Sequence, residues 1–175
     1  MTHAADPTFE ARIDWLLDVL RAQQESHRVL GRFLTEKRQA IRDGDIDAIS
    51  DLCQQENAVA QKIGDAEKQR LVMNGDLTEM LAPTAEVPLS VREIAEHVAE
   101  PKRSQLRCLA ESLRAEINAV RRESSIVAAA ARALSSHMTG IMQSVNRALS
   151  RVQVYERRGR IALGSQTDYR VDVTS

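Results

Sequence analysis

The stretch PKRSQLRCLAESLRAEINAVRRESSIVAAAARALSSHMTGIMQSVNRALSRVQVYERR, residues 101–158, decides the fold of this 175-residue chain. After its first residue it contains no proline, and its single glycine is Gly140. Its apolar residues recur mostly every three or four positions: Leu106, Leu109, Leu113, Ile117, Val120, Val127, Ala131, Leu134, Met138, Ile141, Val145, Leu149 and Val152. This spacing predicts one long amphipathic helix, about 80 Å in length. Because such a helix cannot cover its own apolar stripe, something must pack against it.

The composition agrees with an all-α fold of long helices packed side by side. Aromatic residues make up only 3% of the chain, too few for the centre of an ordinary globule, whereas charged residues make up 28%. The opening MTHAADPTFEARID shows no secretory signal, and no apolar run is long enough to span a membrane. Cys53 and Cys108 lack metal-type spacing. These features lead us to expect a cytoplasmic protein without membrane insertion.

Charge is distributed unevenly along the chain. Residues 1–101 hold 11 Lys/Arg and 19 Asp/Glu, a balance of −8, whereas residues 102–160 hold 12 and 4, a balance of +8. A basic helix can indicate a nucleic-acid partner. We favour packing of the basic helix against the acidic half of the same chain, because the basic residues occur only in pairs and lack aromatic neighbours that would stack on bases. We therefore expect no nucleic acid among the partners.

Upstream of the long helix, residues 9–81 predict an antiparallel helical hairpin. A stripe with heptad spacing runs from about residue 9 to 42, with polar insertions at Gln23, His27 and Lys37. Gly44 suits the left-handed position that ends a helix, and Asp45 suits the cap of the next. A turn there pairs residues whose numbers sum to about 87. The segment 74–76, Asn-Gly-Asp, either ends the second helix or only bends it.

The remaining segments connect and finish this helical domain. Residues 82–89 contain two prolines and predict a linker. Ser90 and Glu93 form a capping box that opens a short helix over 90–100, and Pro101 either kinks that helix or starts the long one. We expect a single domain over residues 1–158 and a mobile tail over 159–175.

Sequence signals for catalysis, cofactors or metals are missing. His27, His97 and His137 repeat no metal-binding spacing, and no glycine-rich phosphate loop or Gly-x-Ser-x-Gly is present. Three long rods also make a poor concave pocket. We therefore expect no enzyme activity, no cofactor and no metal, and a function exercised through contact.

The long helix is longer than the hairpin that would cover it. Starting near Lys102, it draws level with the turn at Gly44 after roughly 30–37 residues, so residues from about Thr139 onward extend past the hairpin. An exposed apolar stripe of this size usually marks a binding site. The alternatives are a partner protein or a homodimer, and the flat patch Ala128–Ala131 is a second candidate surface. The predicted partner-binding residues are Ile141, Val145, Leu149, Val152 and Tyr155, flanked by Arg147 and Arg151.

The order of these features resembles the FlgN-type flagellar export chaperones. The first helix carries the seam Ile13-Asp14-Trp15-Leu16-Leu17, and the second opens with Asp45-Ile46-Asp47-Ala48-Ile49. The long helix closes with Val154-Tyr155-Glu156-Arg157-Arg158-Gly159, similar to the family's Tyr-x-x-x-Gly. One departure is Glu123-Ser124-Ser125, where many members carry paired asparagines.

The resemblance implies a cytoplasmic chaperone that binds hook-associated proteins of the hook–filament junction. Such a chaperone keeps them from assembling prematurely and delivers them to the gate of the flagellar type III export machine, without nucleotide or catalysis. The alternative is a structural coiled-coil adaptor or homodimer with no role in export.

Overall fold

The computed structural model describes the backbone of residues 7–155 and the side chains of residues 7–150. These residues form four helices: α1 (Pro7–Asp43), α2 (Ile46–Leu81), α3 (Val91–Glu96) and α4 (Lys102–Tyr155). No strand occurs within this described part. The predicted all-α fold, with an antiparallel hairpin and a long third helix, is therefore confirmed.

Contacts divide the chain into two units, one that ends at Arg132 and one that begins at Ala133. The first unit contains α1, α2, α3 and the first part of α4, and the second contains the rest of α4. The single domain over 1–158 stays a prediction. The tail expected over residues 159–175 lies outside the described residues.

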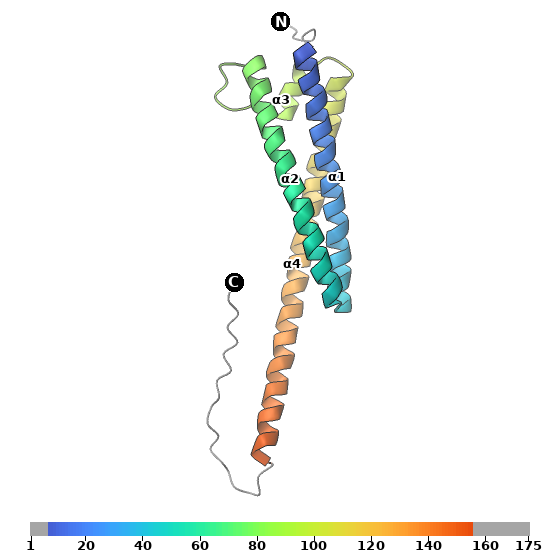
Figure 1. Cartoon of the computed structure of the whole chain (residues 1–175), viewed down its shortest axis with the longest axis vertical. Helices are drawn as coiled ribbons and strands as arrows, with labels where there is room; N and C mark the ends of the chain where they lie inside the picture. Colours follow the sequence, from blue (N-terminus) through green and yellow to red (C-terminus); the bar gives the residue numbers. More distant parts are fainter. Residues whose placement is uncertain (1–6, 156–175) are drawn as a thin grey trace. The chain divides into compact units, whose positions relative to one another are not determined.

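The turn of the hairpin forms as the sequence indicates. Gly44 has a φ of 70°, in the left-handed region where a side chain would be strained. A carboxylate oxygen of Asp45 accepts a hydrogen bond from the backbone N–H of Ala48 at 3.0 Å, which caps α2. Figure 1 shows α1 and α2 side by side, joined at this turn. α2 continues without a break through Asn74, Gly75 and Asp76 to Leu81.

The polar pairs between α1 and α2 lie at or somewhat beyond the predicted register. Arg12 lies 3.8 Å from Asp76, and their numbers sum to 88, close to the predicted sum. The side-chain amide of Gln23 donates to Glu67 at 2.9 Å, and Lys37 donates to Glu56 at 2.7 Å. The numbers of these partners sum to 90 and 93, not about 87. Side chains on a helix tilt toward its N-terminus. In an antiparallel pair, two side chains that meet therefore come from residues with higher numbers than the backbone positions that lie opposite each other, so the sum of their numbers is larger.

The linker after α2 is fixed by polar contacts with α2. The Asn74 side chain donates to the carbonyl of Leu89 at 3.1 Å, and the Leu89 N–H donates to the hydroxyl of Thr78 at 2.8 Å. The capping box of Ser90 and Glu93 is present at the start of α3. α3 covers six residues, and Pro101 neither kinks it nor occupies the first turn of α4. Instead, the Pro101 carbonyl accepts the first helical hydrogen bond of α4, from Gln105.

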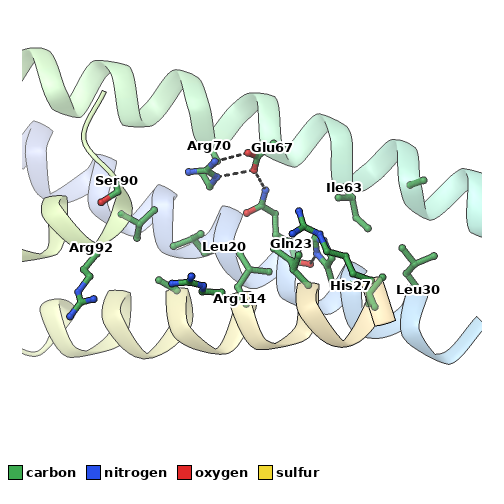
Figure 2. Close-up of a pocket in the computed structure, with 17 residues that line it drawn as sticks. Leu20, Gln23, His27, Leu30, Ile63, Glu67, Arg70, Ser90, Arg92 and Arg114 are labelled. Atoms are coloured by element: carbon green, nitrogen blue, oxygen red, sulfur yellow. Dashed lines mark hydrogen bonds and ion pairs between the residues drawn. The ribbon is translucent and has the colours of Figure 1, made fainter. Parts of the chain in front are cut away.

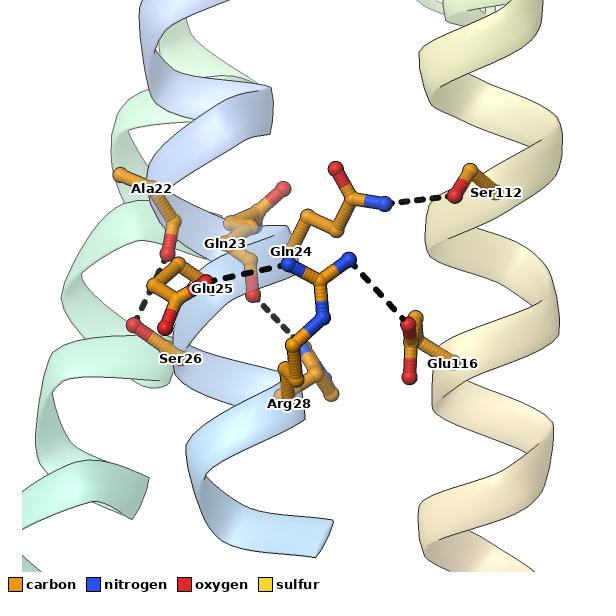
Figure 3. Close-up of polar contacts among 9 residues, drawn as sticks. Ala22, Gln23, Gln24, Glu25, Ser26, Arg28, Ser112 and Glu116 are labelled. Carbon is orange, nitrogen blue, oxygen red and sulfur yellow. Dashed lines mark hydrogen bonds and ion pairs between the residues drawn. The ribbon is translucent and has the colours of Figure 1, made fainter.

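Within the first unit, α4 runs parallel to α1. Lys102 contacts Glu10 at 2.6 Å and Asp14 at 2.7 Å, and further along Arg38 lies 3.1 Å from Glu123. Figure 3 shows the middle of this contact, where Gln24 donates to Ser112 at 2.5 Å and Arg28 reaches Glu116. Among the described residues, Lys102 on α1 and Arg107, which pairs with Glu96 of α3, follow the expected pattern of a basic α4 on acidic partners. The later α1–α4 pairs have the opposite polarity.

The core of the first unit lies where α1, α2, α3 and the start of α4 meet. Its members are apolar residues that are almost fully buried: Phe9, Ile13, Leu16, Leu17, Leu20, Leu77, Val91, Ile94, Ala95, Val98, Leu106 and Leu113. Phe9 and Ile13 of α1 are 0% exposed, as is Ile94 of the short α3. α3 therefore closes one end of the hairpin and helps to hold α4 against it.

Candidate functional site

An exposed apolar face lies on the second unit of α4. Five large apolar side chains there are 47–61% exposed. They follow each other at helical spacing and share one side of the helix. We call them the distal face: Met138, Ile141, Met142, Val145 and Leu149. By contrast, Val127 on the same helix is 4% exposed.

The structure places three of the predicted partner-binding residues together on this face: Ile141, Val145 and Leu149. Val152 and Tyr155 belong to the backbone of α4, but their side chains, like that of Arg151, lie outside the described residues. The side chain of Arg147 is exposed. It follows Val145 by two residues, which is about 200° around a helix, so Arg147 lies opposite the distal face rather than beside it.

Two methionines of the distal face, Met138 and Met142, are absent from the predicted set. Both occupy the helical stripe, and Met138 is part of the apolar pattern in the sequence, but neither is among the predicted partner-binding residues. Methionine is unbranched and polarisable, and it adapts to partner surfaces of different shapes. The face is therefore broader and more adaptable than the predicted residues suggest.

Small side chains beside the distal face leave a shallow hollow on α4. Ser136, Gly140 and Ser144 line it together with Ile141 and Val145. A side chain added at Gly140 would meet nothing within 4 Å. The hydroxyl of Ser144 donates to the Gly140 carbonyl at 2.9 Å, within the same helix. Another helix can approach closely here, because the neighbouring residues are small and this hydroxyl is already satisfied.

A second hollow lies in the first unit, between α2 and α4, and encloses about 640 Å³. We call it the α2–α4 groove. Its floor comes from α1, with Leu20, Gln23, His27 and Leu30. Figure 2 shows α2 and α4 as its two walls and Ser90 and Arg92 at one end.

The hydrogen-bonded polar groups of the groove lie on its α1 and α2 side. Glu67 accepts hydrogen bonds from Arg70 at 2.5 and 2.8 Å and from Gln23 at 2.9 Å. The hydrogen bond from Arg70 is the main reason that the pKa of Glu67 is lowered, with a smaller effect of Gln23. The same contact raises the pKa of Arg70. Gln23 is 2% exposed, and its side-chain oxygen has no hydrogen-bond partner.

A further, partly buried ion pair joins Lys37 of α1 to Glu56 of α2 within the hairpin. Burial lowers the pKa of Lys37, but hydrogen bonds to Glu56 and Cys53 outweigh this effect, so the net pKa is raised. His27 is also buried, and its Nδ1 lies 2.8 Å from the carbonyl oxygen of Gln23. All three polar insertions of the α1 seam therefore have a partner from α1 or α2.

Within the described part of the chain, no group of three or more His, Cys, Asp or Glu residues is arranged to hold a metal ion. No helix there has an apolar stretch of the length needed to span a bilayer. The two surfaces that stand out, the distal face and the α2–α4 groove, are both suited to contacts with another helix.

Comparison with protein families supplies the identification. The family model described as FlgN protein matches residues 12–162, which include nearly all of α1, the whole of α2 and α3, and all of α4 with its distal face. Comparison with curated proteins and with solved structures gave no match. The match covers far more than half of the sequence, and the helical order agrees with the features from which the resemblance was drawn. The chain belongs to the FlgN family.

Proposed function

We propose that this protein is a cytoplasmic flagellar type III export chaperone that binds hook-associated proteins of the hook–filament junction. It keeps them from assembling prematurely and delivers them to the export gate. Membership of FlgN, a family of chaperones rather than enzymes, supports this class of function. The observation that carries the binding role is the distal face, a row of large apolar side chains exposed along α4.

The size of the distal face suits a reversible complex. Each of its five side chains is about half exposed. Completing the burial of one such side chain contributes about 1 kcal/mol, so the whole face contributes about 5 kcal/mol before the cost of ordering the partner. Affinity at this level allows the client to be released at the export gate, as delivery requires.

The proposed binding residues are Ile141, Val145, Leu149, Val152 and Tyr155, together with Met138 and Met142. By helical spacing, Val152 continues the face and Tyr155 lies at its edge. A client helix laid along this face would complete a small helical bundle. Arg147 and Arg151 would act through long-range attraction of an acidic client, which affects the rate of encounter more than the affinity.

The proposed partners include no nucleic acid, and neither a cofactor nor membrane insertion is needed. A homodimer formed through the distal face is the alternative, because the same apolar residues could cover each other. In that case the protein would be a structural adaptor without a role in export.

The function is tested with purified hook-associated proteins mixed with this protein. Size-exclusion chromatography with light scattering should show a defined complex. The chaperone should also suppress the rise in scattering when the hook-associated protein is left to polymerise alone. A stable homodimer that neither binds these proteins nor slows their assembly would contradict the proposal and favour the adaptor.

A further inference from the structure

The three long helices of the first unit are not joined equally. α1 and α2 are linked by Gln23 with Glu67 and by Lys37 with Glu56. α1 and α4 are linked by the pairs that start at Lys102 and end at Glu123. Among residues 7–150, no hydrogen bond or ion pair joins α2 to α4. α1 is therefore the shared partner, and the side of the unit between α2 and α4 is open.

The open side has the dimensions of a helix. The α2–α4 groove is lined by residues 60–70 of α2 and 110–121 of α4, a length of about 17 Å, or three helical turns. Ile63, Ile117 and Val120 line it and are only half-buried. α2 and α4, both packed on α1 in this way, leave open the position that a fourth helix occupies in a four-helix bundle.

The charges around the groove are mainly positive. Arg92, Arg114 and Arg121 line it together with Arg70, whereas Glu67 is its only acidic lining residue. Glu67 is already held by Arg70. Arg114 and Arg121 form no ion pair or side-chain hydrogen bond among the described residues. They are separated by seven residues, so they lie on the same side of α4 and along the same edge of the groove.

The groove also contains an acceptor that the protein itself does not satisfy. Gln23 lies on its floor, and the side-chain oxygen of Gln23 has no hydrogen-bond partner. Figure 2 shows the Gln23 side chain between α1 and Glu67, facing the groove. A buried acceptor without a partner is costly. Because this oxygen is itself buried, only a side-chain donor that reached into the floor of the groove would remove that cost.

We propose that the α2–α4 groove binds an amphipathic helix of about three turns from a partner protein, with an apolar stripe flanked by acidic residues. The apolar stripe would cover Ile63, Ile117 and Val120, and the acidic residues would pair with Arg114 and Arg121. A second copy of the distal face fits less well. Residues 133–150 contain no Asp or Glu, and their only Lys or Arg is Arg147. This site goes beyond the proposed function, which places the client on the distal face.

The test uses two designed helical peptides of 15 residues, each labelled with fluorescein. Both carry leucines at spacings of three and four, and the flanking residues are glutamates in one peptide and lysines in the other. Fluorescence anisotropy measures their binding to the wild type and to the double variant Arg114→Glu/Arg121→Glu. The matched control is Arg122→Glu, because Arg122 is exposed on the same helix but does not line the groove.

We expect the glutamate peptide to bind the wild type and the Arg122→Glu control alike, and to bind the double variant at least about tenfold more weakly. The lysine peptide should prefer the double variant. Ala60→Trp, at an exposed position that lines the groove, should block the glutamate peptide without a change of charge. Circular dichroism should show the same helix content in every variant.

Two results would overturn the inference. The first is a glutamate peptide that does not bind, or that loses binding equally in the Arg122→Glu control. The second is a homodimer of the wild type that the double variant abolishes, which would assign the groove to a second copy. The variant Val145→Asp/Leu149→Asp, which alters only the distal face, should still bind the glutamate peptide with the affinity of the wild type. A failure of the groove proposal can therefore be distinguished from a failure of the distal-face proposal.

Discussion

Truncation of two leucines on the same helix should have very different effects on stability. Leu106 is 0% exposed and belongs to the core of the first unit, whereas Leu149 is 58% exposed on the distal face. We predict that Leu106→Ala lowers the free energy of unfolding by about 3 kcal/mol, because it removes buried methyl groups and leaves a cavity. Leu149→Ala should change it by less than about 0.5 kcal/mol, since little burial is lost and alanine favours the helix.

The assay is urea unfolding followed by circular dichroism at 222 nm. For a chain of this size the free energy of unfolding falls by about 2 kcal/mol per molar urea. The midpoint of Leu106→Ala should therefore shift by about 1.5 M, and that of Leu149→Ala by less than about 0.3 M. Gln143→Ala, an exposed position on the side of α4 opposite Val145, is the control.

Equal shifts for the two leucine variants would refute this reasoning, because Leu149 would then be part of a core. Repeating the measurement at two protein concentrations identifies which core. If the effect of Leu149→Ala grows with concentration, the distal face is the interface of a homodimer rather than a free binding surface.

Two further predictions concern the hairpin. Gly44→Ala should lower the free energy of unfolding by about 1 kcal/mol, because φ is 70° at this position, and thermal melts would measure the loss. A gain of stability would contradict the left-handed turn. The pKa of Glu67 is lowered by its hydrogen bond from Arg70, with Gln23 and His27 of α1 also facing it. The stabilisation by Glu67 is therefore complete above the ordinary glutamate pKa and is lost as pH falls through the lowered pKa. Urea midpoints measured from pH 6 to pH 3 should fall less steeply for Glu67→Gln than for the wild type, and parallel curves would argue against this linkage.

Local signals in the sequence predicted most of the helix boundaries. Gly44 and Asp45 end α1 and cap α2 through interactions within a few residues, as do Ser90 and Glu93 for α3. Such interactions depend on neighbours in the chain and can be recognised from residue type alone. The prediction of which side chains meet between α1 and α2 was less accurate, because it depends on the tilt and length of side chains such as those of Lys37 and Glu56.

The candidate surfaces were predictable to different degrees. The stripe of Ile141, Val145 and Leu149 follows from helical spacing, and the same spacing places Arg147 on the opposite side of α4. The α2–α4 groove could not be predicted, because it depends on α2 and α4 both packing on α1 without a hydrogen bond or ion pair to each other among residues 7–150. Arg114 and Arg121 contribute to the excess positive charge, but only the packed structure shows that they lie together along the groove.

The most direct test of the central proposal is calorimetric titration of a purified hook-associated protein into the Val145→Asp/Leu149→Asp variant. The matched control is Gln143→Asp/Ser150→Asp, which adds the same charge at exposed positions on the opposite side of α4. We predict that the Val145→Asp/Leu149→Asp variant remains as helical as the wild type and loses at least about 30-fold in affinity, whereas the control stays within about threefold. A Val145→Asp/Leu149→Asp variant that unfolds would show that the distal face is core. One that stays folded and binds like the wild type would show that the client docks elsewhere, with the surface at Ala128–Ala131 next to be tested.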